Sequence, residues 1–545
     1  MRLSLEGLQK REEWEAAGIT LPAYDICAVA DRTKQAPVWV HFGIGNIFRI
    51  FIGGIADSLI TEGALDKGIT CVESFDFDVV DQIYKPYDNL VLGVTLMADG
   101  STKKQVIGSL TEAIKAQTGV PENWERLRCI FTDPGLQMVS FTITEKGYEL
   151  KNAAGAFFPF VQADIDAGPA KEGQQAPAYN SAMSIVTALL YERYRAGKYP
   201  LAVVSMDNCS HNGEKLMNSI TEMARLWQEK GFVPAEFSAW LKDESQVAFP
   251  WSMIDKITPR PSPSVQAELE KLGLENIAPV ITSKRTYIAP FVNAEGPQYL
   301  VIEDKFPNGR PALEKAGVYM TDRDTVNKVE RMKVTTCLNP LHTALAVYGC
   351  LLGYELIADE MKDKELKELV NRIGPVEGMP VVTDPGILSP KDFVQEVIEV
   401  RLPNPFMPDT PQRIATDTSQ KVGIRYGETI KSYVEKNGNA SALQAIPLAI
   451  AGWLRYLVGV NDKGEAFERS SDPMLEELTA ALDGLALGDT QPKIHKKVQP
   501  ILSNANIFGS DLYQAGIGEK IEGFLEEELK GPGAVRATLI KYIKA

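Results

Sequence analysis

Three residues that lie close together in the chain could do chemistry as a group: Lys333, Asn339 and His342. Pro340 directly after Asn339 predicts a helix that begins there, with Asn339 as its N-cap and His342 in its first turn. Lys333 would end the preceding helix. A lysine can transfer a proton, and a helix N-terminus favours negative charge developing on an oxygen. The residues alone predict either such a site or a capping asparagine, a surface lysine and a core histidine.

A second polar segment, SMDNCSHNG at residues 205–213, follows a strand predicted at 201–205. Ligands of open α/β sheets bind beyond the carboxyl ends of the strands, so this segment is a candidate binding loop. The same residue types are common in loops that bind nothing.

A glycine turn, HFGIGNIFR at residues 41–49, follows a predicted strand at 38–43 and precedes a predicted helix at 46–63. Strand, Gly-x-Gly and helix is the arrangement that places backbone N–H groups around a pyrophosphate. An acid at the end of the next strand, predicted at 69–73, can bind the ribose hydroxyls of NAD and repel the 2′-phosphate of NADP. The sequence therefore predicts an NAD site with these residues: Gly43, Gly45, Asn46, Phe48, Arg49, Glu73 and Asp76.

Metal and disulfide chemistry are not expected. The four histidines have no metal-ligand spacing, and the six cysteines are scattered without a C-x-x-C pair. This pattern is typical of free thiols in a reducing compartment.

The elements that must position these residues differ between the two halves of the chain. In the first half, further strands are predicted at 90–97, 128–132 and 139–144, alternating with helices at 180–196, capped by Asn180, and 213–230, which indicates an α/β fold with a parallel sheet. The second half is predicted to be mostly helical, with segments at 322–336, 340–356, 362–373, 390–400 and 441–458. An irregular stretch rich in Pro, Gly and Asn at 289–309 suggests a boundary, giving a nucleotide-binding domain at 1–297 and a helical substrate domain at 298–545.

Composition narrows the function class. The 545 residues carry a net charge of −15 and are 44% hydrophobic, as in a globular protein with a full core. The acidic balance argues against nucleic acid or an anionic membrane as partner, whereas a small anionic substrate needs only a few local cations. With no apolar segment long enough to span a bilayer and no signal-like start, a cytoplasmic location is expected.

Taken together, these motifs resemble the polyol-specific long-chain dehydrogenase (mannitol dehydrogenase) family. The matching features are the Gly43/Gly45 turn, the segments 139–148 (VSFTITEKGY), 207–213 and 249–259 (FPWSMIDKITP), and the Lys333…Asn339…His342 run. The resemblance implies a Rossmann-type N-terminal domain, a mostly α-helical C-terminal domain, and metal-independent hydride transfer between NAD(P)H and a ketose carbon.

The resemblance also implies roles for individual residues. Lys333 would be the general acid/base, Asn208 and Asn339 would hold the substrate oxygen, and His342 would orient hydroxyls. Asp255 and Asn212 would contact the sugar. The chain departs from the family pattern after the R-x-x-N-P element that begins at Arg401, where Pro408-Asp409 stand in place of a lysine.

The segment 413–425 (RIATDTSQKVGIR) resembles the hexuronate reductase branch. Its Lys421 and Arg425, on one face if the segment is helical, could bind a substrate carboxylate, or the pair could be ordinary surface cations of a helix. Arg401 is a further candidate for substrate binding. The resulting expectation is an NAD-dependent reductase that converts fructuronate to mannonate or tagaturonate to altronate. Alternatives are a mannitol 2-dehydrogenase acting on neutral polyols, a sugar-acid epimerase that retains NAD, and a non-catalytic sugar-binding protein.

Overall fold

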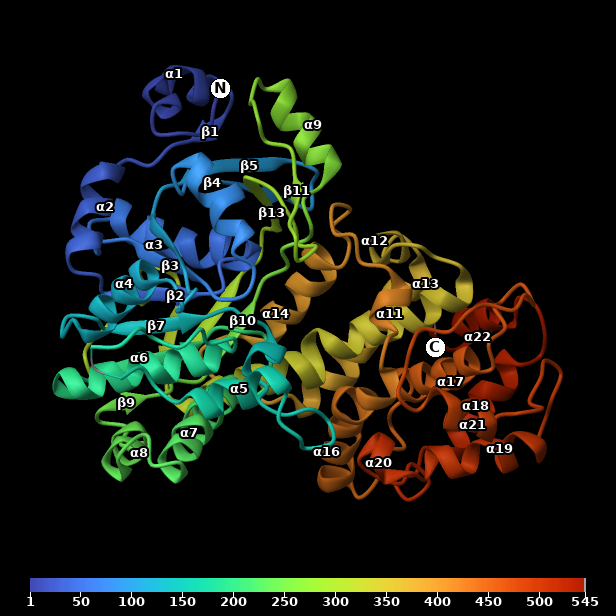
Figure 1. Cartoon of the computed structure of the whole chain (residues 1–545). Coiled ribbons are helices and arrows are strands. Elements are labelled where there is room, and N and C mark those ends of the chain that lie inside the picture. Colours follow the sequence, from blue (N-terminus) through green and yellow to red (C-terminus); the bar gives the residue numbers. More distant parts are fainter. Residues whose placement is uncertain (172, 544–545) are drawn as a thin grey trace. The chain divides into compact units, whose positions relative to one another are not determined.

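The computed structural model describes residues 1–171 and 173–543, which form two compact units. The first comprises 1–97 and 101–327, and the second comprises 98–100 and 328–545 (Figure 1). The division therefore lies beyond the boundary expected at 297/298. The stretch at 289–309 is not a linker, because two strands form there and pair with strands of the first unit, β13 (Phe291–Glu295) with β4 (Val91–Leu96) and β14 (Tyr299–Glu303) with β10 (Ser252–Asp255).

The main sheet of the first unit has six strands in the order β6-β3-β2-β7-β8-β9, and every neighbouring pair is parallel. The earliest strand is central and later strands are added on either side, which is the doubly wound order of dinucleotide-binding sheets. The strands are β2 (Trp39–Phe42), β3 (Ile69–Glu73), β6 (Leu110–Lys115), β7 (Met138–Phe141), β8 (Leu201–Ser205) and β9 (Val247–Ala248).

Smaller sheets complete the strands of this unit. A four-stranded sheet has the order β1-β5-β4-β13, a three-stranded sheet the order β10-β14-β15, and β11 pairs with β12 as a hairpin. The strands not yet given are β1 (Ile19–Thr20), β5 (Thr102–Ile107), β11 (Val280–Ile281), β12 (Tyr287–Ile288) and β15 (Tyr319–Thr321).

Alternating residues of the main sheet serve two separate cores. On β2, Val40 and Phe42 belong to one apolar cluster and Trp39 belongs to the other. The helices of this unit (Figure 1) are α1 (Arg11–Ala16), α2 (Ile26–Gln35), α3 (Gly53–Thr61), α4 (Pro121–Thr132), α5 (Pro159–Ala167), α6 (Ala182–Gly197), α7 (Asn212–Glu229), α8 (Ala235–Lys242) and α9 (Pro263–Lys271). Of these, α4–α8 add residues to the first cluster and α3 adds residues to the second.

Two local predictions in the first unit are wrong. Residues 128–132 are the last turn of α4 and not a strand, because Pro121 starts a helix whose Trp124, Leu127 and Ile130 recur at helical spacing and are buried. The N-cap of α6 is Ser181, whose hydroxyl accepts from Met183 N, and not Asn180.

The second unit is helical, as expected. After α10 (Arg323–Met332), which crosses the division, it contains α11 (Asn339–Leu352), α12 (Ile357–Glu360), α13 (Lys364–Asn371), α14 (Pro390–Glu396), α15 (Pro411–Ile414), α16 (Glu428–Asn437), α17 (Ala445–Leu457), α18 (Leu475–Ala481), α19 (Lys493–Leu502), α20 (Ala505–Phe508), α21 (Gly518–Glu528) and α22 (Ala534–Ile543). Within the described residues, no helix is long and apolar enough to cross a membrane.

A buried carboxyl group in the second unit should make stability depend on pH. Glu360 is 0% exposed, and neither of its oxygens has a hydrogen-bond partner among the described residues. Burial, with the charge of Asp363 as a smaller cause, raises the pKa of Glu360 well above its usual value. The unfolded chain therefore loses this proton at lower pH than the folded chain, and stability falls as pH rises above the unfolded value of about 4.3.

Glu360→Gln should remove the loss of stability that the buried carboxyl causes as pH rises. We expect the melting temperature of the variant to exceed that of the wild type at pH 8, and the difference to shrink toward pH 5. Thermal melts at both pH values measure this, with Glu355→Gln, an exposed position, as the matched control. An identical pH dependence in wild type and Glu360→Gln would contradict the expectation.

Candidate active site

The glycine turn leaves its backbone open to a ligand. Gly43 has φ +87°, and a Cβ there would lie 2.1 Å from the carbonyl oxygen of Thr142, so only glycine fits. A Cβ at Gly45 would meet nothing within 4 Å. The space beside Gly45, at the start of the helical segment that follows β2, fits the close approach of a pyrophosphate to backbone N–H groups.

Two residues of this turn have an internal role. Phe48 is 0% exposed and stacks on His41 with ring centroids 4.1 Å apart. Arg49 is also fully buried; it donates to the carbonyl oxygen of Pro290 at 3.1 Å and lies 3.5 Å from Asn46 Oδ1. Burial lowers the pKa of Arg49 to about 10. Phe48 and Arg49 support the turn from inside, and their expected contact with a cofactor stays a prediction.

The two acids expected at the ribose are likewise engaged within the protein. Glu73, the last residue of β3, accepts from Phe75 N at 2.8 Å, Asp76 N at 3.1 Å and Ile44 N at 3.4 Å. The last of these bonds joins β3 to the glycine turn. Burial raises the pKa of the Glu73 carboxyl, against the effect of these donors. Asp76 is 4% exposed and accepts from two threonine hydroxyls.

The loop after β8 is held by hydrogen bonds that the sequence did not reveal. Asp207 accepts from Ile143 N and Thr144 N, each at 2.9 Å, and from the Tyr148 hydroxyl at 2.6 Å. Burial is the main cause that raises the pKa of Asp207. Asn208 follows Asp207 and is exposed, at the end of the sheet where ligands of this fold bind.

Asn212 is a structural residue in this arrangement. Its amide nitrogen lies within hydrogen-bond distance of Ser205 O, Asp207 O and Ser252 Oγ, and its Oδ1 accepts from Ser252 N at 3.0 Å. These contacts use the polar atoms of a side chain that is 1% exposed, so direct substrate contact by Asn212 is not supported. Asp255 is the last residue of β10, the strand that also contains Ser252, and is 5% exposed; its contact with the sugar stays a prediction.

In the second unit, Lys333 begins a π-helical segment, Lys333–Cys337, and is 5% exposed. The structure corrects the expected cap: α11 begins at Asn339 itself, and no side-chain cap bond forms. Instead the Thr343 hydroxyl donates to the backbone oxygen of Asn339 at 2.9 Å. His342 lies in the first turn of α11, as predicted.

Asp409 is a neighbour of His342 that sequence reasoning missed. His342 Nε2 lies 3.5 Å from Asp409 Oδ2, and Arg413 pairs with the other carboxylate oxygen. Burial opposes ionisation of Asp409, but His342 and Arg413 outweigh it, and its pKa is lowered. The Asp409 carboxylate therefore stands beside the imidazole, in the segment where the family pattern predicts a lysine.

The two cations predicted to bind a carboxylate lie next to these residues. Arg425 Nη1 donates to Thr343 Oγ1 at 2.5 Å, and Lys421 Nζ donates to the backbone oxygen of Thr416 at 2.5 Å. Burial lowers the pKa of Arg425 to about 10; burial and then the charge of Arg425 lower the pKa of Lys421. Within the described residues, neither cation forms an ion pair with a carboxylate.

Lys421 and Arg425 do not share the face of a regular α-helix. Lys421 follows a short 3₁₀ turn, and Arg425 lies in the π-helical segment Gly423–Gly427. Tyr426, next to Arg425, donates to the carbonyl oxygen of Pro340 at 3.0 Å. Arg425 and Tyr426 thus both bind the N-terminal part of α11, which contains His342.

Several predicted site residues lie in π-helical segments, whose turns are wider than those of an α-helix. The described chain contains six π-helical segments, and four of them include such a residue: Phe48–Ile52, Lys333–Cys337, Val397–Arg401 and Gly423–Gly427. π-Bulges inside α-helices are frequent at functional sites. Arg401, 5% exposed, ends the third of these.

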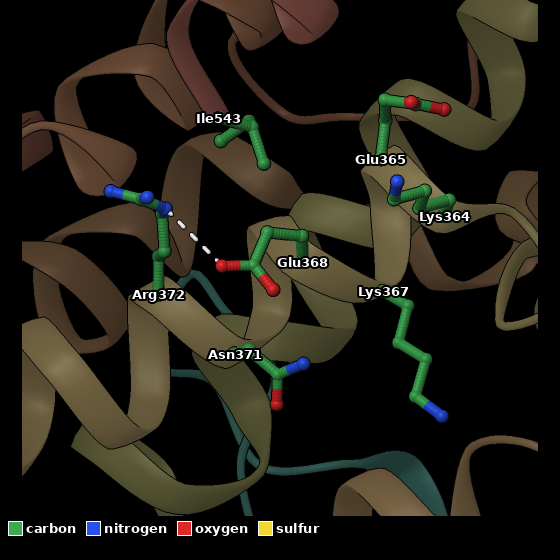
Figure 2. Close-up of a pocket in the computed structure, with 7 residues that line it drawn as sticks. All are labelled: Lys364, Glu365, Lys367, Glu368, Asn371, Arg372 and Ile543. Carbon is green, nitrogen blue, oxygen red and sulfur yellow. Dashed lines mark ion pairs between the residues drawn. The ribbon is translucent and has the colours of Figure 1, made fainter. Parts of the chain in front are cut away.

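A hollow of about 370 Å³ on the second unit contains none of the predicted site residues. Figure 2 shows its lining, which consists of residues of α13, Arg372 directly after that helix, and Ile543 from α22. Its charges are of both signs, and Arg372 Nε lies 3.4 Å from Glu368 Oε1. This hollow therefore offers no concentrated charge for a substrate.

Comparison with known proteins decides the family. The model described as the mannitol dehydrogenase Rossmann domain matches residues 38–315, and the one described as the mannitol dehydrogenase C-terminal domain matches residues 325–527. The chain belongs to the mannitol dehydrogenase family. It is an oxidoreductase with a Rossmann N-terminal domain and a helical C-terminal domain, and the two matched ranges agree with the division near residue 327.

The similarity to individual relatives extends over 96% or more of this mannitol dehydrogenase family member. It is 52% identical over 546 residues to D-mannonate oxidoreductase of Thermotoga maritima, covering 100% of this chain and 99% of the relative. A structure of D-sorbitol dehydrogenase in substrate-free form is 26% identical, with a TM-score of 0.76 over 96% of this chain and 98% of that one. The ternary complex of Pseudomonas fluorescens mannitol 2-dehydrogenase with NAD and D-mannitol is 26% identical, with a TM-score of 0.69 over all of both chains.

Proposed function

We propose that this oxidoreductase interconverts fructuronate and mannonate with NAD(H). The observation that carries the substrate class is the pair Lys421 and Arg425, two partly or largely buried cations that form no ion pair with a carboxylate of the described chain. A substrate carboxylate would stabilise the charged form of such desolvated cations, and Arg can bind it through two hydrogen bonds. The 52% identity to a D-mannonate oxidoreductase supports the same substrate.

The proposed reaction adds a hydride and a proton to a keto group. Bound NADH would supply the hydride, and Lys333 would donate the proton to the carbonyl oxygen as general acid. Asn208 and Asn339 would donate amide hydrogen bonds to that oxygen as negative charge develops on it, without adding charge of their own. His342, held beside Asp409, would orient a substrate hydroxyl, and Asp255 would accept from another.

NAD is the proposed cofactor. The open space at Gly45 supports a dinucleotide, and a structural relative was solved with NAD bound. Glu73 is the last residue of β3 and bonds to the glycine turn. In this fold an acid at the end of that strand lies close to the ribose, which supports NAD as the cofactor.

Loss of NADH absorbance with purified protein tests the proposal, using a panel of fructuronate, tagaturonate, fructose and fructose phosphate. Rapid turnover of fructuronate, with fructose at least about tenfold slower in kcat/KM, is expected from one charge-assisted contact. Preference for tagaturonate would reassign the substrate within the hexuronates, and preference for fructose would contradict the carboxylate site. Conversion of a sugar acid without added NADH, by protein that co-purifies with cofactor, would indicate an epimerase instead.

A further inference from the structure

The hairpin of β11 and β12 is fastened to the loop that follows β3. Asp76 Oδ2 accepts from Thr282 Oγ1 at 2.6 Å and from Thr286 Oγ1 at 2.5 Å. Asp78 Oδ2 accepts from Ser283 N at 2.8 Å. These contacts join segments about two hundred residues apart, all within the first unit.

Asp76 also determines the shape of the hairpin loop through Thr282. Thr282 Oγ1, which donates to Asp76, accepts from Thr286 N at 3.0 Å, and Thr282 N donates to Thr286 O at 3.0 Å. The loop holds Arg285 at φ +64°, a conformation that needs support in a residue other than glycine. Loss of the carboxylate would leave both threonine hydroxyls without their buried acceptor.

Large apolar side chains are exposed on the two segments that this attachment joins, the loop after β3 and the hairpin. Phe75 is 69% exposed and Ile281 is 71% exposed, and Lys284 Nζ lies 5.3 Å from the centre of the Phe75 ring. Glu73 accepts from both Phe75 N and Ile44 N, so the aromatic residue and the glycine turn share one anchor. Exposed aromatic rings are surfaces on which nucleobases stack, and a neighbouring cation favours phosphate.

We propose that Asp76 is a positioning residue that holds the hairpin in place, so that Phe75, Ile281 and Lys284 form the surface that receives the adenosine half of the dinucleotide. This proposal rests on the proposed function, because it assumes that a dinucleotide binds. It differs from the sequence-based expectation that Asp76 binds the ribose directly. Asp76 Oδ2 is occupied by the two threonines, and Oδ1 is enclosed without a hydrogen-bond partner in the described chain.

Two variants separate the positioning role from direct ribose binding. Asp76→Asn and the double variant Thr282→Val/Thr286→Val should each weaken NADH binding about tenfold, and NADPH binding by the same factor. Fluorescence titrations give both Kd values. The double variant Thr282→Ser/Thr286→Ser keeps the hydroxyls and is the matched control, with wild-type affinity expected.

Direct ribose binding gives a different pattern. Asp76→Asn alone would then lose NADH affinity, the valine pair would be harmless, and the ratio of the NADPH Kd to the NADH Kd would fall because a negative charge near the 2′-phosphate is removed. That result would overturn the proposal.

The stacking surface has its own test. Phe75→Ala should weaken the binding of NADH and the binding of 5′-AMP, measured as its competition with NADH, whereas Phe75→Tyr should retain both affinities.

Amide hydrogen exchange tests whether the hairpin is loosened locally. In the Thr282→Val/Thr286→Val variant, faster exchange confined to residues 280–288 is expected. Loss of affinity without that local change overturns the positioning role. A wild type that binds no NADH would overturn the proposed function itself, whereas NADH binding that is unchanged in Phe75→Ala and in the valine pair overturns only this inference.

Discussion

Replacing Lys333 with methionine should lower kcat for fructuronate reduction about 100- to 10,000-fold, the usual contribution of a positioned proton donor. Lys333 is 5% exposed, and methionine keeps most of the volume of its side chain while removing the ammonium group. The Kd for NADH should stay near the wild-type value, because the glycine turn that would bind the pyrophosphate belongs to the first unit. Steady-state kinetics and a fluorescence titration measure the two quantities.

A matched control and a rescue experiment make the role of Lys333 specific. Lys391→Met, at an exposed position of α14, should keep wild-type kcat. In Lys333→Ala, added methylamine should restore part of the rate by supplying a proton donor in the vacated space, and it should not accelerate the wild type. A kcat for Lys333→Met within about tenfold of the wild type would contradict the acid–base role.

Arg425→Met should reduce kcat/KM for fructuronate about 10- to 100-fold and leave the lower rate with fructose nearly unchanged. A hydrogen bond to a charged group contributes about 1.5–3 kcal/mol, which corresponds to that range. Fructose lacks the carboxylate, so it gains nothing from the guanidinium. The ratio of the two kcat/KM values is the measurement, since general damage to the fold would lower both.

Further variants divide the effect between charge and geometry. Arg425→Lys keeps the cation and should recover part of the fructuronate rate. Lys421→Met should show the same selectivity as Arg425→Met with a smaller loss, because a lysine acts as a point charge without the two-pronged geometry of Arg. Lys436→Met, an exposed position on α16, is the control. Equal losses with fructuronate and fructose in Arg425→Met would assign the residue to the fold and not to the substrate.

The sequence by itself determined the elements that depend on local pattern. The strands at 39–42, 69–73 and 201–205 lie where buried apolar runs predicted them, because a parallel strand covered on both faces is apolar throughout. Ser389 caps α14 with Pro390 at its first position, a signal contained in two adjacent residues. The glycine turn was equally readable, because the left-handed backbone at Gly43 admits little else.

Local pattern was misleading where a short apolar run fits two structures. Residues 128–132 have the composition of a strand, and only the helical spacing from Pro121 onward shows that they end α4. Similarly, the Pro, Gly and Asn residues at 289–309 resemble a linker but lie between and around two paired strands.

Only the tertiary structure decided what each polar side chain does. Glu73, Asp76 and Asn212 all have residue types that suit a binding site, yet most of their polar atoms bond to the protein itself. The same holds for Asp409, whose partner His342 is far away in the chain. Most buried polar groups have a hydrogen-bond partner, and nothing in the local sequence says whether that partner is a ligand or a distant segment of the same chain. Types and spacing therefore identified the chemistry available to this protein, and long-range packing decided which residues remain available to perform it.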